Sequence, residues 1–218
     1  MNTSIIRQEN IAKLLLNKWF WIVFFIFTFG YPVYRSMNRT LPKPLPVYFK
    51  LPSYKLTNEF NKSFGSNDLK GRIYLANFIF TRCPVKCPAL MKKMQSIQKR
   101  MRGLGASVAI VSFTVDPLHD KPPQLFKYAR DLQTNPHIWN FLTGNLDAME
   151  NLLVKGFKVP IGDTRTVSDI VDLAHSEKVV LVDREGRVRG YYGTDKISID
   201  QMMIDVGLLA NNAFRGET

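Results

Sequence analysis

Residues 73–88 read IYLANFIFTRCPVKCP, the most informative stretch of the chain. Its first eight residues form a nearly continuous apolar and aromatic run, which is typical of a strand in the middle of a sheet. Pro88 suits the first position of a helix, where its missing N–H costs nothing. The stretch therefore predicts a buried strand, then a short turn that carries Cys83 and Cys87, and then a helix.

The rest of the chain alternates between helical and strand patterns. Four segments are predicted to be helices: 88–102, 121–133, 147–156 and 199–210. Four more are predicted to be strands: 106–115, 138–142, 179–183 and 188–192. The last two strands are joined by a hairpin turn signal. This order predicts an α/β, thioredoxin-like fold, with a central mixed β-sheet flanked by helices.

The two cysteines are the only ones in the 218 residues, are spaced C-x3-C, and are each followed by proline. Buried cysteines are common core residues, but this spacing at a strand-to-helix turn favours a chemical site. Cys87 is expected near the helix N-terminus, where the helix dipole lowers the pKa of a thiol, and Lys86 and Arg82 act in the same direction. Two such sulfurs can form a disulfide or hold one soft metal ion, and the spacing alone supports both equally.

A copper or zinc site needs ligands besides two sulfurs, and the chain has three histidines: His119, His137 and His175. Each taken singly is typical of an ordinary surface histidine. In a thioredoxin-like sheet, the loop entering the third core strand faces the loop after the first, which would bring His175 to the cysteines. Two thiolates and an imidazole form a soft three-coordinate set that suits Cu(I) and tolerates Cu(II), whereas zinc would want a fourth protein ligand.

A membrane anchor is predicted near the N-terminus. Residues 19–34 (WFWIVFFIFTFGYPVY) carry no charge, and a helix of that length spans roughly 24 Å against a hydrocarbon core of ~30 Å. The preceding leucines and a snorkelling Lys18 bring the segment within range. Because no small-residue cleavage site follows, an uncleaved anchor is favoured over a signal peptide. A buried core helix would need a polar face, which this segment lacks.

The anchor divides the chain into four predicted parts: a short cytoplasmic or matrix-side N-terminus at 1–18, the anchor at 19–34, a Pro-rich basic tether at 35–50 and the folded domain at 51–218. Half of the net charge of +12 lies in the first 50 residues. Anionic lipid attracts such a basic tail as well as nucleic acid does, and the anchor favours lipid, so no nucleic-acid partner is expected. The domain is predicted to be anchored in the inner membrane and to face the periplasm. The mitochondrial intermembrane space is the less favoured alternative.

Four motifs, taken in order, resemble the Sco/SenC family of membrane-anchored, thioredoxin-like copper proteins that assist cytochrome c oxidase assembly. They are residues 81–88, the Asp116-Pro117…Asp120…Pro122 loop, residues 141–144 (FLTG) and His175-Ser176, and the likeness covers roughly 47–210. By position, the resemblance implies that Cys83, Cys87 and His175 bind copper and that the two aspartates lie in a supporting acidic loop.

The function that the resemblance implies is a metallochaperone for the copper site of the oxidase. The alternative is a thiol–disulfide reductase that keeps the target's copper-ligand cysteines reduced, with Cys83 and Cys87 as its redox dithiol. The expected partners are a copper-receiving oxidase subunit, the membrane and a thiol–disulfide reductant. A non-catalytic copper or redox sensor is a third class, and peroxidase activity a weaker fourth.

The chain departs from the usual family pattern at several positions. An acid usually follows Cys83-Pro84, where Val85 and then Lys86 stand here, and another acid usually stands in place of Ala174. An arginine is also commoner where His119 stands. A cation between two thiolates lowers their pKa, yet it also repels an incoming copper ion. These departures put copper affinity in question more than redox activity.

The helix at 88–102 carries cations and no acid: Lys92, Lys93, Lys99, Arg100 and Arg102. We interpret them as a solvated face opposite an apolar stripe that includes Met94 and Met101. Met91 lies off that stripe and remains a candidate for an additional copper ligand. Residues 163–172 (DTRTVSDIVD) are predicted to be a mobile loop that leads to His175.

Overall fold

The computed structural model describes residues 17–38, 44–82, 86–158 and 178–211. The chain divides into two compact units, Met1–Lys43 and Pro44–Thr218. Each unit is described by itself below.

The first unit contains one run of helical residues, Lys18–Met37. It consists of α2 (Lys18–Phe25), a π-helical segment η1 (Ile26–Gly30) and α3 (Tyr31–Met37). Pro32 lies in α3, and the wider π turn before it accommodates a residue that has no N–H to donate.

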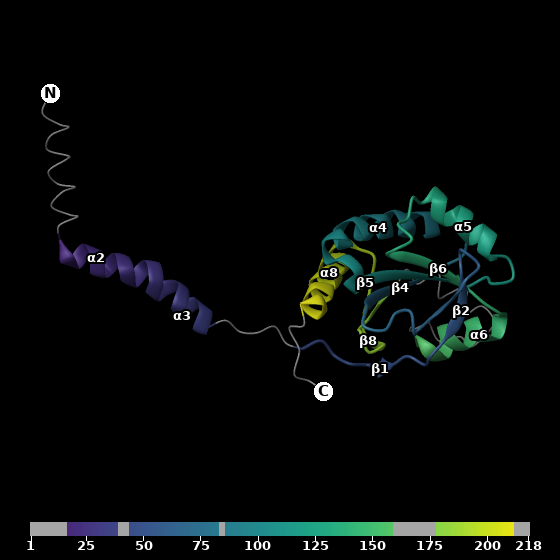
Figure 1. Ribbon diagram of the computed structural model, residues 1–218, viewed down its shortest axis with the longest axis horizontal. Helices are drawn as coiled ribbons and strands as arrows, with labels where there is room; N and C mark the ends of the chain where they lie inside the picture. Colours follow the sequence, from purple (N-terminus) through teal and green to yellow (C-terminus); the bar gives the residue numbers. More distant parts are fainter. Residues whose placement is uncertain (1–16, 39–43, 83–85, 159–177, 212–218) are drawn as a thin grey trace, which may run out of the picture. The chain divides into compact units, whose positions relative to one another are not determined.

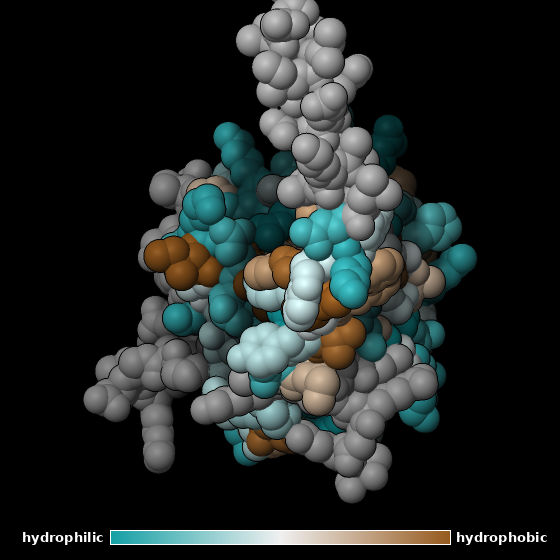
Figure 2. Space-filling model, turned by 90° about the vertical axis from the view of Figure 1, so that its left-hand side faces the viewer, coloured by the Kyte–Doolittle hydropathy of each residue, from teal (hydrophilic) through white to brown (hydrophobic). Residues whose placement is uncertain are grey.

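The side chains of this helical run lie on the surface. None is buried, and most of the large apolar ones are exposed. Figure 2 shows in brown and tan the apolar residues on the face of the molecule that is turned to the viewer. Twenty residues of helix are about 30 Å long, so by length and composition this segment could cross a membrane. A signal sequence would pass the same test. The helix continues to Met37, three residues into the segment expected to be tether.

The second unit is built on a mixed sheet in which the described residues form eight strands in the order β1-β8-β7-β4-β5-β6-β2-β3 (Figure 1). The strands are β1 (Phe49–Lys50), β2 (Lys55–Asn58), β3 (Ser63–Gly65), β4 (Ile73–Ile79), β5 (Val108–Thr114), β6 (Trp139–Thr143), β7 (Val179–Val182) and β8 (Arg187–Tyr192). Strands β4, β5 and β6 are parallel, whereas β7 is antiparallel to β4 and β8 is antiparallel to β7. The predicted mixed sheet and the β7–β8 hairpin are confirmed.

Helices and helical turns connect the strands and cover the sheet. They are α4 (Lys86–Met101), η2 (Arg102–Ser107), α5 (Pro122–Asp131), α6 (Leu146–Glu150), η3 (Asn151–Gly156) and α8 (Lys196–Ala210). Each predicted helix is therefore present within a few residues of its expected bounds. The predicted α/β architecture with helices around a central sheet is confirmed (Figure 1).

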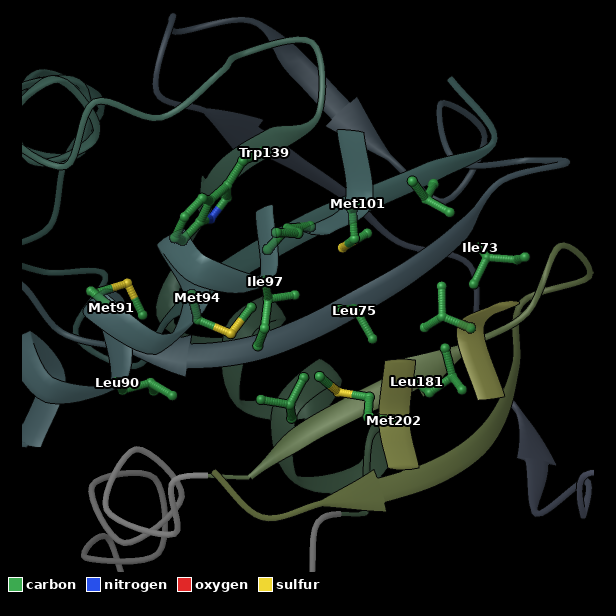
Figure 3. Close-up of a cluster of buried hydrophobic side chains, with 14 of the residues drawn as sticks. Ile73, Leu75, Leu90, Met91, Met94, Ile97, Met101, Trp139, Leu181 and Met202 are labelled. Atoms are coloured by element: carbon green, nitrogen blue, oxygen red, sulfur yellow. The ribbon is translucent and has the colours of Figure 1, made fainter. Parts of the chain in front are cut away.

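The sheet separates two hydrophobic clusters, and β4 contributes to both. Alternate β4 residues such as Ile73 and Leu75 pack with α4, α5 and α8, while Tyr74 and Phe78 pack with α6 and η3 on the opposite face. Figure 3 shows the first cluster. Successive side chains of a strand point to opposite faces, so a strand covered on both sides must be apolar throughout, which explains the continuous apolar run in the sequence.

The folded unit begins before residue 51. Strand β1 pairs with β8, and the buried guanidinium of Arg189 donates hydrogen bonds to the carbonyl oxygens of Leu45 (2.6 Å) and Pro46 (3.0 Å). The same guanidinium forms an ion pair of 2.9 Å with Asp183, which is also buried. The last residues of the expected tether are thus attached to the edge of the sheet.

Candidate functional site

The predicted ligands lie largely outside the described residues. Cys83 and His175 fall in the undescribed ranges 83–85 and 159–177, as does the predicted mobile loop, and only the backbone position of Cys87 is described. Among the side chains that the structure does describe, no three from His, Cys, Asp or Glu are arranged to hold a metal ion. What the structure describes is the framework from which the ligand-bearing segments depart.

Three of the strands bring these segments to one edge of the sheet. Ile79, the last residue of β4, pairs with Thr114 at the end of the parallel strand β5. Val179, at the start of β7, pairs with Asn77 in antiparallel register. The chain leaving β4 reaches Cys83 four residues after Ile79, and the chain entering β7 passes His175 four residues before Val179. The end of the strand that leads to Cys83 and the start of the strand that follows His175 therefore lie at the same edge of the sheet.

Helix α4 begins earlier than expected. Its first residue is Lys86, so Cys87 lies in the first turn of the helix, and that turn contains no acidic residue. The first four N–H groups of a helix lack intrahelical partners and carry partial positive charge, which favours an anion such as a thiolate. The backbone position of Cys87 is therefore suited to a reactive or metal-binding sulfur.

A buried carboxylate lies at the same edge. Asp120 has no exposed surface, and it accepts hydrogen bonds from the backbone N–H of Thr81 (3.1 Å), the Thr81 hydroxyl (2.5 Å) and the Thr114 hydroxyl (2.5 Å). The resemblance placed Asp120 in a supporting acidic loop and Thr81 at the start of the cysteine motif, but it did not connect these two residues and did not include Thr114. The sequence signal for Thr114 was that the apolar strand β5 ends in this polar residue.

The second acid of this loop, Asp116, forms an ion pair with Arg82 at 2.5 Å. The Arg82 side chain is 61% exposed, so water screens this pair. Arg82 was expected to act on the cysteines through its positive charge. Its guanidinium is instead paired with the Asp116 carboxylate.

Two of the histidines occupy ordinary surface positions. His119 is exposed in the loop between β5 and α5, where its backbone N–H donates to the Asp116 carbonyl oxygen at 3.2 Å. His137 is exposed just before the first residue of β6. Since β6 is parallel to β4, its start lies at the edge of the sheet opposite to the end of β4. Both observations agree with their interpretation as surface residues.

The idea that Met91 is an additional copper ligand is not supported by its position. Met91 has no exposed surface and packs in the same cluster as Met94 and Met101, which were predicted to be core (Figure 3). Met91 precedes Met94 by three residues, so the two share one helix face. The apolar stripe of α4 is therefore wider than the stripe inferred from the sequence, because the helix packs against a broad sheet.

Replacing Met91 by leucine is expected to leave copper binding unchanged. The substitution removes the thioether sulfur while nearly conserving volume, so the free energy of unfolding should fall by less than about 1.5 kcal/mol. Copper stoichiometry and affinity, measured by competition with a chelator, test the ligand question, and urea unfolding tests the packing. A folded Met91→Leu protein that had lost its copper would contradict this assignment.

Most of the α4 cations whose side chains the structure describes are exposed, as interpreted. Lys92, Lys99 and Arg100 are exposed. Arg100 forms an exposed ion pair with Asp200 of α8 at 2.8 Å. Lys93 is half-buried and donates a hydrogen bond to the Thr194 hydroxyl.

The folded unit is similar to a known family of proteins. The model of the SCO1/SenC family matches residues 47–210. A SCO1 protein homolog from Bacillus subtilis is 31% identical over 163 residues, which cover 74% of this chain and 83% of that protein. The matched range contains the strands and helices described in the second unit and all three predicted ligand positions.

Solved structures of similar proteins share the fold. BsSco, described as a member of the Sco family of cytochrome c oxidase assembly proteins with a disulfide switch, is 29% identical, with a TM-score of 0.66 over 79% of this chain and 99% of that chain. Yeast Sco1 with copper bound is 23% identical, with a TM-score of 0.56 over 76% of this chain and 95% of that chain. At that lower identity the likeness concerns the fold.

Proposed function

Because the chain belongs to the SCO1/SenC family, we propose that it is a membrane-anchored metallochaperone for the copper site of a cytochrome c oxidase. Its cargo is one copper ion, held by Cys83, Cys87 and His175. The observation that carries the proposal is that the end of β4, which leads to Cys83, and the start of β7, which follows His175, lie with the end of β5 at one edge of the sheet. The relative described as a member of the Sco family of cytochrome c oxidase assembly proteins supports it.

The proposed donor set fits copper better than other metals. Two thiolates and one imidazole are soft ligands, and three-coordination is acceptable to Cu(I), whereas structural zinc sites use four protein ligands. Asp120 and Asp116 already have hydrogen-bonding partners at this edge, so neither is a free carboxylate. Copper binding requires both thiols to lose their protons, and the start of α4 favours that at Cys87.

The oxidation state of the two cysteines would control loading. A Cys83–Cys87 disulfide has no thiolate to offer, so the oxidised protein would not hold copper tightly. Loading would therefore require a thiol reductant that transfers two electrons to the disulfide and leaves two thiols. The helical run Lys18–Met37 would anchor the protein in the inner membrane, with the folded unit in the periplasm.

A titration of the reduced full-length protein in mild detergent tests the proposal. We expect one Cu(I) per chain to be retained against a competing chelator under anaerobic conditions. With Cu(II), a thiolate-to-copper absorption band is expected. If no copper is held against the chelator while the dithiol–disulfide couple is normal, the metallochaperone function is wrong.

A thiol–disulfide reductase is the second candidate function. It is favoured by the position of Cys87 in a helix first turn without acids and by Lys86 beside it in the sequence. In that reaction a thiolate attacks the disulfide of a target protein, the target gains two thiols, and Cys83 and Cys87 become a disulfide that an external dithiol reduces again. Turnover with a disulfide-bonded substrate peptide, absent when either cysteine is serine, would support this function.

A further inference from the structure

The sheet releases the chain shortly before the cysteines. The last residue of β4 is Ile79, whose carbonyl oxygen accepts a hydrogen bond from the N–H of Val115 at 2.8 Å. Beyond this point, the backbone N–H of Thr81 donates to the side chain of Asp120 at 3.1 Å. Up to Ile79, the backbone of β4 is held by hydrogen bonds to the neighbouring strands. At Thr81, the backbone is held by a hydrogen bond to the side chain of Asp120.

The carboxylate of Asp120 uses both of its oxygens. Oδ2 accepts from the Thr81 N–H and from the Thr114 hydroxyl, while Oδ1 accepts from the Thr81 hydroxyl. Hydrogen bonds to an ionised acceptor are shorter and stronger than neutral ones. Two of these three bonds end on Thr81, which is 39 residues from Asp120 along the chain and two residues before Cys83.

The loop that presents Asp120 is itself fastened to the end of β5. The N–H of Asp120 donates to the carbonyl oxygen of Asp116 at 2.8 Å, and the N–H of Asp116 donates to the Thr114 hydroxyl at 3.0 Å. Thr114 therefore donates to Asp120 and accepts from Asp116. This closed set of bonds makes the loop a fixed support, so Thr81 is attached to the strand and not to a free side chain.

We propose that Asp120 is a positioning residue that fixes the start of the cysteine loop by holding Thr81 against the end of β5. Burying a carboxylate is unfavourable unless its oxygens are hydrogen-bonded, and here most of the compensation comes from the one residue that leads directly to Cys83. The inference rests on the proposed function, because the consequence of the position is the geometry of a copper site. Asp120 would act through Thr81 and does not touch the metal.

Two substitutions of Asp120 separate position from charge. Asp120→Ala removes all three acceptors and frees Thr81. Asp120→Asn keeps an oxygen for the Thr81 N–H and the Thr114 hydroxyl, and its amide can donate to the Thr81 hydroxyl, so it loses the charge but retains the attachment. We expect Cu(I) affinity to fall about 10- to 100-fold in Asp120→Ala, the usual loss when an outer-shell partner is removed, and to change less than about threefold in Asp120→Asn.

A buried carboxylate elsewhere provides the matched control. Glu59 is 3% exposed and accepts a hydrogen bond from the backbone N–H of Phe141 at 3.0 Å, on the β2–β6 side of the sheet. Glu59→Ala therefore removes a buried acceptor away from the end of β4. It should lower the melting temperature and leave Cu(I) affinity within about threefold of the unmodified protein, since a general loss of stability does not alter the site.

A copper-independent measurement keeps the inference separate from the proposed function. Amide hydrogen exchange of the reduced, copper-free protein should be faster in peptides covering residues 78–90 in Asp120→Ala, and unchanged there in Asp120→Asn and Glu59→Ala. Unchanged exchange in Asp120→Ala would overturn the inference. So would equal copper affinity in Asp120→Ala and the unmodified protein, or an equal loss in Asp120→Ala and Asp120→Asn, which would indicate an effect of charge. Failure of the unmodified protein to bind copper would instead overturn the proposed function.

Discussion

Serine at position 83 or 87 is expected to abolish tight copper binding. Cu(I) prefers thiolate ligands, and a serine hydroxyl does not ionise at neutral pH, so either variant leaves one sulfur and one imidazole. In anaerobic titration against a chelator, the reduced protein should retain one Cu(I) per chain, and Cys83→Ser and Cys87→Ser should retain none. The effect is large because each substitution removes a ligand rather than displacing one.

Met91→Leu is the matched control for this experiment, because it also removes one sulfur, from a buried position in α4. It should retain its copper. His175→Ala should behave differently from both cysteine variants: Cu(I) tolerates two thiolate ligands, so the main loss should be in Cu(II) affinity and in the absorption of the Cu(II) complex. Full-strength copper binding by the double cysteine variant would exclude the proposed ligand set.

Among the substitutions considered, Asp183→Ala is expected to cause the largest loss in the free energy of unfolding. The carboxylate of Asp183 accepts hydrogen bonds from the backbone N–H groups of Glu185 (3.1 Å) and Arg187 (2.9 Å) in the β7–β8 hairpin. It also pairs with the guanidinium groups of Arg187 (2.8 Å) and Arg189 (2.9 Å). Asp183 is 3% exposed and the Arg189 side chain 5%, so removing the acid leaves a buried cation without its counterion. The expected cost is about 3–5 kcal/mol.

Urea unfolding of the full-length protein in mild detergent measures this loss. Asp200→Ala is the control, because Asp200 pairs with Arg100 and Lys196 on the surface, where an ion pair contributes little. Its midpoint of unfolding should stay close to that of the unmodified protein. Equal midpoints for Asp183→Ala and Asp200→Ala would show that the buried pair does not support the hairpin.

Asp183 should also make the stability of the protein depend on pH. Burial raises the pKa of Asp183, but hydrogen bonds from the Arg187 N–H and from the guanidinium groups of Arg189 and Arg187 outweigh it and hold the pKa below its ordinary value. A carboxylate with a lowered folded-state pKa stabilises the fold above its unfolded-state pKa of about 4. That contribution is lost as the pH falls through the folded-state pKa. The stability of the unmodified protein should therefore decline below about pH 4, and Asp183→Ala should lack this part of the decline.

Much of the fold could be predicted because its central strands are covered on both faces. Such strands are continuous apolar runs, as β4 and β5 are, and the periodicity of α4 follows from packing one side on the sheet. Strands β1, β2 and β3 were not predicted. They are two to four residues long, and sequences such as KLTN have no marked pattern. They form by pairing at the outer strands of the sheet: β1 pairs with β8, β2 pairs with β6, and β3 pairs with β2. This pairing is a tertiary condition.

The sequence by itself determined the α/β class, the apolar N-terminal segment, and the choice of Cys83, Cys87 and His175 as candidate ligands, because local patterns and the order of motifs carry that information. Only the tertiary structure decided that the strands preceding Cys83 and following His175 share an edge, that Met91 is buried, and that Asp120 holds Thr81. These facts depend on strand register and burial between segments far apart in the chain. A single sequence records neither, since each is set by residues that meet only when the sheet forms.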